Sequence, residues 1–311
     1  MDIQDTEITL AFQSLRLKVS PYGASLRGLW MEAPDGAQHP IITGYTGARG
    51  KVGGQGDVLI PFPGRVRDGR YTFEGQSYQM NCNDKDGPNA IHGFVRLKPW
   101  DTAQQSEASI TFVTSLNAGD HPGYPFALRA SVTYALDGNG LTCRFAITNL
   151  GESTAPVAAG FHPYFTVGSE QIDLDRLTVP MAATLEFENL LPTGQVTPVE
   201  GTAFDFRQPR RIGATAFNTC YLNPRRDPDG LLRIQLQASE SQNFLTVWLD
   251  AAFDYLVLYS GDPLPDSHRR RALAIEPMTC ASDAFNHPAW GLISLKPGET
   301  AEGAWGVTAA V

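Results

Sequence analysis

The chain has 311 residues, of which 42% are hydrophobic and 18% charged, and its net charge is −9. The negative charge argues against a nucleic-acid partner, because phosphate binding needs a concentrated basic surface. The acidic stretch 1–12 lacks the basic and apolar regions of a signal peptide. No apolar run approaches the roughly 20 residues that span a bilayer, so we expect no membrane partner either.

Alternating and β-branched runs dominate the chain and predict strands. The 30 Gly and 22 Pro indicate many turns between them. In chain order, the clearest predictions are a tight hairpin over 68–78, strands over 110–116, 130–136, 141–149, 244–250 and 254–260, and two strands joined by a Pro-Gly turn over 294–310. Hairpin turns are predicted at the Asp-Gly pairs 35–36, 68–69, 137–138 and 229–230.

No amphipathic helix longer than about two turns fits the helical template of apolar spacing. Residues 117–125 and 262–271 are predicted to be long loops rather than domain boundaries, and no repeat or linker is evident. The pattern therefore predicts an all-β protein, a large sandwich of antiparallel strands. We expect a single domain over residues 1–311.

The cysteines are sparse and widely spaced. Cys82, Cys143, Cys220 and Cys280 lie about sixty to eighty residues apart, without a CxxC pair. Disulfide-rich secreted folds are denser in cysteine, and zinc sites usually pair their ligands locally. We therefore expect reduced structural thiols, no metal site and a cytoplasmic location.

Four polar residues stand in apolar or Gly- and Pro-rich sequence. They are Arg65 in PFPGR, His92 in PNAIHGF, His162 in GFHPYF and Glu276 in LAIEPM. Such groups are costly to bury unless they are paired or used. A guanidinium, two imidazoles and a carboxylate can perform acid–base chemistry without a metal or an organic cofactor, so they are candidate site residues and no cofactor is expected.

Each of these residues also has a purely structural interpretation. His162 can be a hydrogen-bonded core histidine, and His92 a surface residue of a loop. Glu276 and Arg65 can form a buried ion pair, although a guanidinium also suits the vicinal oxygens of a ligand. The residues alone leave these interpretations open.

Two other segments look like motifs. The glycine-rich segment 47–56 lacks the Gly-Lys-Ser/Thr ending and the strand–helix setting of a phosphate loop. The HRRR run at 268–271 follows a Pro-rich loop, which predicts a solvated turn. A grip on an anionic substituent is the alternative for this run.

Four segments resemble motifs of the aldose 1-epimerase (galactose mutarotase) family, in the family's order. They are PFPGRVRDGRYTFEGQSY, PNAIHGF, GFHPYF and LAIEPMTCASDAFN. The similarity runs from about residue 10 to the final LKPGET segment, and the last motif looks like a divergent bacterial branch. The resemblance implies a galactose mutarotase-like supersandwich of antiparallel sheets with few short helices.

The resemblance also implies roles for the matching residues. Glu276 falls on the family's catalytic base and His162 on its catalytic acid. Arg65 and His92 fall on substrate-binding positions. Asn218 stands where the family usually has a substrate-binding aspartate.

Two further positions depart from the family. Val257 falls on a glutamine that many members use, and Gly64 replaces the asparagine of an Asn-Arg pair. Because the acid and base are intact while hydroxyl-reading residues have changed, we expect a different sugar rather than lost chemistry.

The expected function is mutarotation, in which the α and β anomers of an aldose interconvert by ring opening and reclosure. Ionised Glu276 and protonated His162 are expected to face each other across a pocket one pyranose ring wide. Phe62, Phe161 or Tyr164 is expected to cover the apolar face of the sugar.

Three alternatives remain open. A non-catalytic carbohydrate-binding protein of the same fold is a rival from another class. A lyase or glycosidase is weaker, because a typical glycosidase needs two carboxylates and Asp283 is the only acid near Glu276 in sequence. A phosphorylated or sulfonated sugar would draw on Arg67, Arg70 and Arg269.

Overall fold

The computed structural model describes residues 6–47 and 50–310. The start of the acidic N-terminal stretch and residues 48–49 of the glycine-rich segment lie outside the described residues. Within the described part, the helical segments are three short 3₁₀ turns, η1 (Arg67–Gly69), η2 (Ile172–Leu174) and η3 (Pro288–Trp290). The all-β prediction is confirmed, and none of the described helices is long and apolar enough to cross a membrane.

One antiparallel sheet has twelve strands. In spatial order its main path is β1 (Ile8–Phe12), β2 (Leu15–Ser20), β3 (Ser25–Glu32), β4 (Gln38–Thr43), β16 (Tyr164–Phe165), β25 (Leu273–Met278), β24 (Tyr255–Tyr259), β21 (Asn218–Pro224), β18 (Met181–Glu188) and β19 (Leu191–Pro198). Beside this path, β15 (Gly160–Phe161) pairs with both β25 and β5 (Val58–Leu59).

A second antiparallel sheet has nine strands. Its order is β10 (Asp101–Gln105), β11 (Ser109–Leu116), β12 (Leu128–Asp137), β13 (Gly140–Asn149), β27 (Thr300–Ala310), β23 (Phe244–Leu249), β22 (Leu232–Gln237), β17 (Arg176–Thr178) and β20 (Arg210–Arg211). The five individual strands predicted from alternation correspond to β11, β12, β13, β23 and β24. The segments 117–125 and 262–271 are loops, as predicted.

Three two-stranded sheets complete the fold. They are β6 (Arg65–Val66) with β9 (Ala90–Ile91), β7 (Arg70–Phe73) with β8 (Gln76–Gln79), and β14 (Ala155–Val157) with β26 (Ile293–Leu295). The pair β7–β8 confirms the predicted hairpin. Both C-terminal strands exist, but β26 pairs with β14 and β27 pairs with β13 and β23, so they do not form a hairpin with each other.

Two of the four predicted hairpin turns are wrong. The Asp-Gly pairs 35–36 and 137–138 do join the paired strands β3–β4 and β12–β13. The pair 68–69 instead lies in η1, and the pair 229–230 connects β21 to β22 in the other sheet. Both glycines still take a positive φ, because an Asp-Gly pair favours a local turn without specifying which strand the chain joins next.

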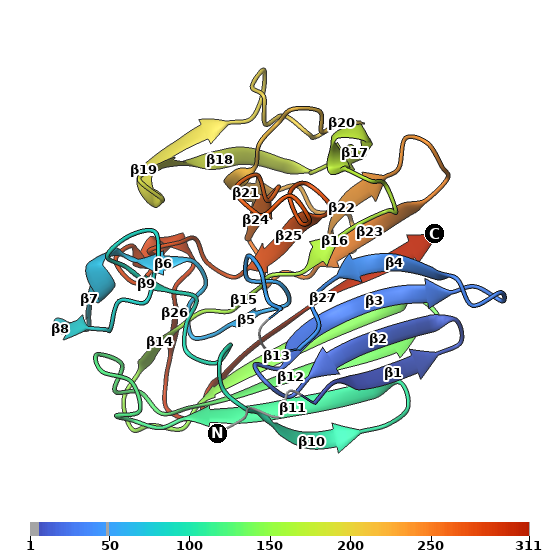
Figure 1. Ribbon diagram of the computed structural model, residues 1–311. Coiled ribbons are helices and arrows are strands. Elements are labelled where there is room, and N and C mark those ends of the chain that lie inside the picture. The colour runs from blue at the N-terminus through green and yellow to red at the C-terminus, as the bar shows by residue number, and fades with distance from the viewer. Residues whose placement is uncertain (1–5, 48–49, 311) are drawn as a thin grey trace.

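The two large sheets share one hydrophobic core. In Figure 1, the blue strands β1–β4 lie across the green strands β11–β13. The core cluster includes Leu17 and Leu29 from the first sheet and Val132, Ile147 and Trp305 from the second. Burial alternates along β12 with period two, so one face of the strand packs into this core. The strands β25, β24 and β21 also contribute to this core, for example Ile275, Leu258 and Tyr221, so a site on them must use their other face.

Candidate active site

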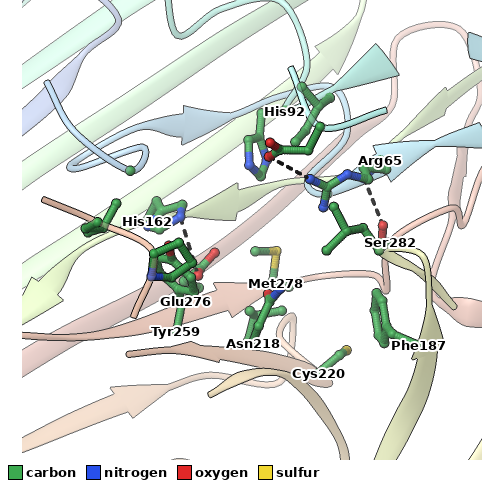
Figure 2. Close-up of a pocket in the computed structure, with 18 residues that line it drawn as sticks. Arg65, His92, His162, Phe187, Asn218, Cys220, Tyr259, Glu276, Met278 and Ser282 are labelled. Carbon is green, nitrogen blue, oxygen red and sulfur yellow. Dashed lines mark hydrogen bonds and ion pairs between the residues drawn. The ribbon is translucent and has the colours of Figure 1, made fainter. Parts of the chain in front are cut away.

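A cavity of about 550 Å³ lies against the strands β25, β24 and β21. Its lining includes all five residues predicted as site residues, Arg65, His92, His162, Asn218 and Glu276. Figure 2 shows their side chains directed toward a common space. They come from five separate parts of the chain, so the fold brings together residues that the sequence spreads over more than two hundred positions.

The register of the sheet places His162 beside Glu276. The short strands β15 and β16 both pair with β25, Gly160 near one end of it and Tyr164 near the other. His162 lies midway between them and therefore stands opposite Glu276. The distance from Nε2 of His162 to Oε1 of Glu276 is 3.4 Å (Figure 2). The two groups are neighbours in one wall, and the expectation that they face each other across a ring is wrong.

The imidazole of His162 is fixed on several sides. The ring of Tyr164 stacks on it, with centroids 5.2 Å apart and planes 13° apart. The backbone N–H of His162 donates to the Asp57 carbonyl at 3.1 Å. A Cβ at Gly54, where φ is +75°, would lie 2.9 Å from Cδ2 of the imidazole. Gly54 is therefore required both by its backbone conformation and by the close approach of the ring.

Burial governs the electrostatics of the pair. Glu276 is 3% and His162 7% exposed. Burial raises the pKa of Glu276 well above its ordinary value and lowers the pKa of His162 to about 3, because desolvation disfavours the charged form of each group. Burial therefore favours the uncharged forms of both groups, and the expected pairing of ionised Glu276 with protonated His162 stays a prediction.

Arg65 and His92 reach the pocket from the β6–β9 ribbon. Arg65 pairs with Ile91 in this ribbon, which brings His92 next to it. The backbone N–H of His92 donates to the Gly64 carbonyl at 2.9 Å, and its ring centroid lies 6.0 Å from that of His162. Burial lowers the pKa of His92 well below its ordinary value, so this imidazole is neutral at physiological pH.

The ion-pair partner of Arg65 is a residue of the neighbouring loop. Its Nε donates to Oδ2 of Asp84 at 2.6 Å, and its Nη2 lies 3.9 Å from Oδ2 of Asp86. The backbone N–H of Arg65 donates to Oγ of Ser282 at 2.8 Å. Arg65 and Glu276 are therefore not each other's ion-pair partners, and that interpretation is wrong. The charged or polar partner of Glu276 is His162.

Residues 6–306 match the family model described as Aldose 1-epimerase. The chain belongs to the aldose 1-epimerase family. It is 30% identical to the Escherichia coli protein named YihR over 232 residues, 74% of this chain and 71% of that protein. It is also 30% identical to the galactose mutarotase of Rattus norvegicus over 213 residues, but these cover 66% of this chain and 61% of the rat protein.

Solved structures of the family share the whole fold. An aldose epimerase homologue from C. elegans superposes with a TM-score of 0.87 at 21% identity, over 98% of this chain and 99% of that one. The galactose 1-epimerase from Lactobacillus acidophilus gives a TM-score of 0.80 at 20% identity, over 98% and 94% of the two chains. The predicted galactose mutarotase-like supersandwich is confirmed.

All three departures from the family pattern, Asn218, Val257 and Gly64, line the pocket. Asn218 begins β21 and pairs in register with Tyr259, and both line the cavity. Val257 also lines it and pairs with Glu276 on one side and Cys220 on the other. The strip of pocket next to the carboxylate is therefore apolar.

The predicted aromatic cover is wrong in all three candidates. Phe62, Phe161 and Tyr164 are buried and do not line the cavity. Phe187 on β18, which is 36% exposed, and Tyr259 on β24 line it instead. Tyr259 lies two residues after Val257 on β24, so their side chains share a face, and this spacing could have identified Tyr259. No sequence signal indicates that Phe187 of the β18–β19 hairpin lies at the pocket.

The predicted solvated turn at 268–271 is wrong for Arg270, which is 7% exposed. Its Nε donates to Oδ1 of Asp173 at 2.6 Å and its Nη1 to Oδ1 of Asp262 at 3.0 Å. Two backbone carbonyls, those of Gly213 and Thr215, accept from the same guanidinium. Arg270 therefore anchors the 262–271 loop and does not face a ligand.

The other residues invoked by the alternatives lie outside the pocket. Arg67, Arg70 and Arg269 do not line it. Asp283 is buried and accepts hydrogen bonds from the backbone N–H of Arg67 and the side chain of Asn286. Asp283 therefore has a structural role, because its carboxylate links the segments that carry Arg67 and Asn286. Among the described residues, no group of three or more His, Cys, Asp or Glu side chains could hold a metal ion.

Proposed function

We propose that this protein is a mutarotase that interconverts the α and β anomers of an aldose. The observation that carries the proposal is the 3.4 Å contact between Nε2 of His162 and Oε1 of Glu276, buried in the wall of a sugar-sized pocket. Ring opening must remove a proton from the anomeric hydroxyl and deliver one to the ring oxygen. Both oxygens are bonded to C1, so an acid and a base that are neighbours suit the reaction.

The pair holds the one proton that the reaction needs. Protonated Glu276 with neutral His162, and ionised Glu276 with protonated His162, differ only in the position of this proton across 3.4 Å. Sugar hydroxyls that hydrogen-bond to the charged forms favour the second arrangement. In that state Glu276 takes the proton of the anomeric hydroxyl and His162 protonates the ring oxygen.

The aldehyde then rotates about the C1–C2 bond, and closure reverses both transfers. The enzyme returns to its starting state and no cofactor is consumed. We assign Arg65, His92 and Asn218 to binding, because all three line the same pocket and can hydrogen-bond to sugar hydroxyls. Acid–base catalysis contributes on the order of 10²–10⁴ per transfer.

The test is polarimetry on freshly dissolved aldoses with Glu276→Gln and His162→Asn. We expect each variant to lose at least about a hundredfold in rate, since each removes one of the two proton transfers. Glu186→Gln, at an exposed position on β18, is the matched control and should keep the wild-type rate. A near-wild-type rate in either site variant would refute the assignment.

A non-catalytic carbohydrate-binding protein is the second candidate. The observation in its favour is that Val257 and Asn218 stand in the pocket where hydroxyl-reading residues were expected. It predicts saturable sugar binding without any acceleration of anomer exchange. Saturation-transfer NMR on the two anomeric protons separates the two functions.

We also propose that the chain forms a single domain over residues 1–311, since the family match covers 6–306. A cytoplasmic location is proposed because all four cysteines are free thiols, the state that reducing compartments maintain.

A further inference from the structure

The glycine-rich segment of the sequence lies against His162, although it is not a phosphate loop. We use the name glycine loop for residues 50–57, which lead into β5. The strand β5 pairs with β15, which directly precedes His162, and Figure 1 shows these two strands side by side. The backbone N–H of Gly56 donates to the His162 carbonyl at 3.0 Å, and the His162 N–H donates to the Asp57 carbonyl at 3.1 Å. The glycine loop and His162 are therefore joined through their backbones.

The glycine loop also contacts the side chains that surround the imidazole. The hydroxyl of Tyr164, whose ring stacks on that of His162, donates to the Gly53 carbonyl at 2.6 Å. The backbone of Gly54 approaches the imidazole so closely that an added Cβ would lie 2.9 Å from Cδ2. The position of the imidazole therefore depends on how this loop is held.

Asp57 fixes the end of the glycine loop with a fully buried carboxylate. One of its oxygens accepts from Nζ of Lys51, within the same loop. The other accepts from Nη1 of Arg96 at 3.3 Å, on the segment that follows His92. Burial raises the pKa of Asp57, and the two cations oppose this rise. With both cations in contact the carboxylate is ionised at neutral pH. We call Lys51, Asp57 and Arg96 the ion cluster.

The ion cluster carries two positive charges and one negative charge beside the acid–base pair. The groups that face His162 from other elements are Glu276, Tyr164, Tyr259 and His92. Burial raises the pKa of both tyrosines and lowers that of His92, so these three are uncharged at neutral pH. The net positive charge of the ion cluster is therefore the main fixed charge that acts on the pair from the described residues around it.

We propose that Asp57 is a positioning residue, which holds the glycine loop against His162 by pairing with Lys51 and Arg96. The inference rests on the proposed function for its kinetic consequences, because it takes His162 to be the catalytic acid. Loss of the carboxylate loosens the loop, and small displacements of a reacting group are costly. It also changes the charge beside the pair, and the two apparent pKa values of a coupled pair respond together to such a change.

The first variant is Asp57→Asn, which keeps the shape of the side chain and removes its charge. D-galactose and D-glucose are the probes, and circular dichroism checks the fold. We expect kcat of anomer exchange to fall roughly tenfold to a hundredfold. The pH profile of kcat/KM should move to lower pH by on the order of half a unit to one unit, because more positive charge disfavours protonation. A wild-type kcat with an unmoved profile overturns the inference.

Lys51 supplies a test of opposite sign. Lys51→Met removes one positive charge and one contact of Asp57, so kcat should fall while the pH profile moves to higher pH. Lys51→Arg keeps the charge and should restore the position of the profile. Shifts of the same sign in Asp57→Asn and Lys51→Met overturn the inference. Because Lys51→Met leaves Asp57 paired with Arg96, this variant decides the question if Asp57→Asn does not fold.

Lys296→Met is the matched control for the loss of one lysine charge. Lys296 is exposed and follows β26, outside the pocket and the ion cluster. This variant should change neither kcat nor the pH profile. If it moves the profile as far as Lys51→Met does, the total charge of the protein and not the ion cluster is responsible, and the inference fails.

A measurement without sugar separates this inference from the mutarotase proposal. NMR follows the ring protons of His162, assigned by their absence in His162→Asn, and their nuclear Overhauser effect to the Hα protons of Gly54. We expect this effect to weaken in Asp57→Asn and the titration midpoints to move as the pH profiles do. If the wild type exchanges no aldose, only the mutarotase proposal fails. If both NMR signals stay unchanged in Asp57→Asn and Lys51→Met, only the positioning role fails.

Discussion

The imidazole of His162 depends on the absence of a side chain at Gly54. A Cβ at this position would lie 2.9 Å from Cδ2 of His162, closer than real Cβ atoms come, and 3.1 Å from Nε2, which is also a tight contact. We expect Gly54→Ala to displace the ring from Glu276 and to lower kcat roughly tenfold to a hundredfold, since small misplacements at a reacting centre are costly. Steady-state kinetics with a folding check by circular dichroism measures this.

Gly36→Ala is the matched control for the backbone strain. Gly36 also has a positive φ, +84°, but no atom lies within 4 Å of its added Cβ. Gly36→Ala should therefore lower the free energy of unfolding without changing kcat. If Gly54→Ala behaves like Gly36→Ala, the ring of His162 is not held by this contact.

For single residues, the polar groups of the site could be predicted from the sequence, but the side chains that surround them could not. His162 and Glu276 stand out in sequence because a polar group in an apolar run is costly. The aromatic residues of the pocket do not stand out in the sequence. Nothing in the sequence distinguishes Phe187, which lines the pocket, from Phe62, which does not. The effect of burial on the pKa values of the pair could not be predicted either, since burial depends on the whole fold.

The 262–271 loop depends on one buried cation. Arg270 donates to Asp173 and Asp262 from a buried position, and the loop contributes Pro263 and Leu264 to the pocket. We expect Arg270→Gln to lower the free energy of unfolding by about 1–3 kcal/mol, less than for a fully buried pair because both aspartates are more than a third exposed. Urea titration measures the loss.

The neighbouring Arg271 supplies the control. Its side chain is 43% exposed and pairs with an exposed glutamate, so Arg271→Gln should change the free energy of unfolding by less than about 0.5 kcal/mol. Equal effects of the two variants would show that the Arg270 network does not hold the loop. Arg270→Gln should also raise KM, because the loop lines the pocket.

Elements were predicted well where alternation was strong. The burial patterns of β12 and β13 repeat with period two, and these strands were found nearly to the residue. Pairing was predicted less well, as the Asp-Gly pair 229–230 shows. A turn signal acts over four residues, whereas the choice of partner strand is made by the packing of the whole sheet.

For the whole molecule, the acid–base pair makes stability depend on pH. In the fold the pair keeps one proton from pH about 3, where His162 would gain one, up to the raised pKa of Glu276. In the unfolded chain the ordinary pKa values are 4.5 for Glu276 and 6.5 for His162. The unfolded pair thus holds two protons below pH 4.5, one between 4.5 and 6.5, and none above.

Stability falls wherever the unfolded state binds protons differently from the fold. Below pH 4.5 the unfolded chain holds the extra proton, so stability decreases as pH falls. Above pH 6.5 the fold holds the extra proton, so stability decreases as pH rises, by up to about 1.4 kcal/mol per unit. Unfolding free energies of the wild type minus those of Glu276→Gln/His162→Asn should therefore form a plateau between pH 4.5 and 6.5.

The double variant removes the contribution of the many other titrating groups from this comparison. A difference that stays flat from pH 6.5 to 9 would show that Glu276 is already ionised in the fold. The experiment therefore counts the protons that the folded pair holds, without any sugar and without any activity.

The two-layer architecture could be inferred from strand content, and the order of the strands could not. Gly160 and Tyr164 place His162 opposite Glu276 only because β15 and β16 both pair with β25. This pairing joins residues more than a hundred positions apart. It follows from the core that the two large sheets share, which no local pattern describes.

The division of the pocket between a central strand and an outlying hairpin has an evolutionary consequence. Glu276 lies on β25, between two paired neighbours, whereas Phe187 and Leu190 lie at the β18–β19 hairpin, where the sheet ends. Mutations accumulate more easily at such a margin than in the interior of a sheet. Related proteins can thus change the Phe187 and Leu190 side of the pocket, and with it the ligand, while the neighbourhood of Glu276 stays the same.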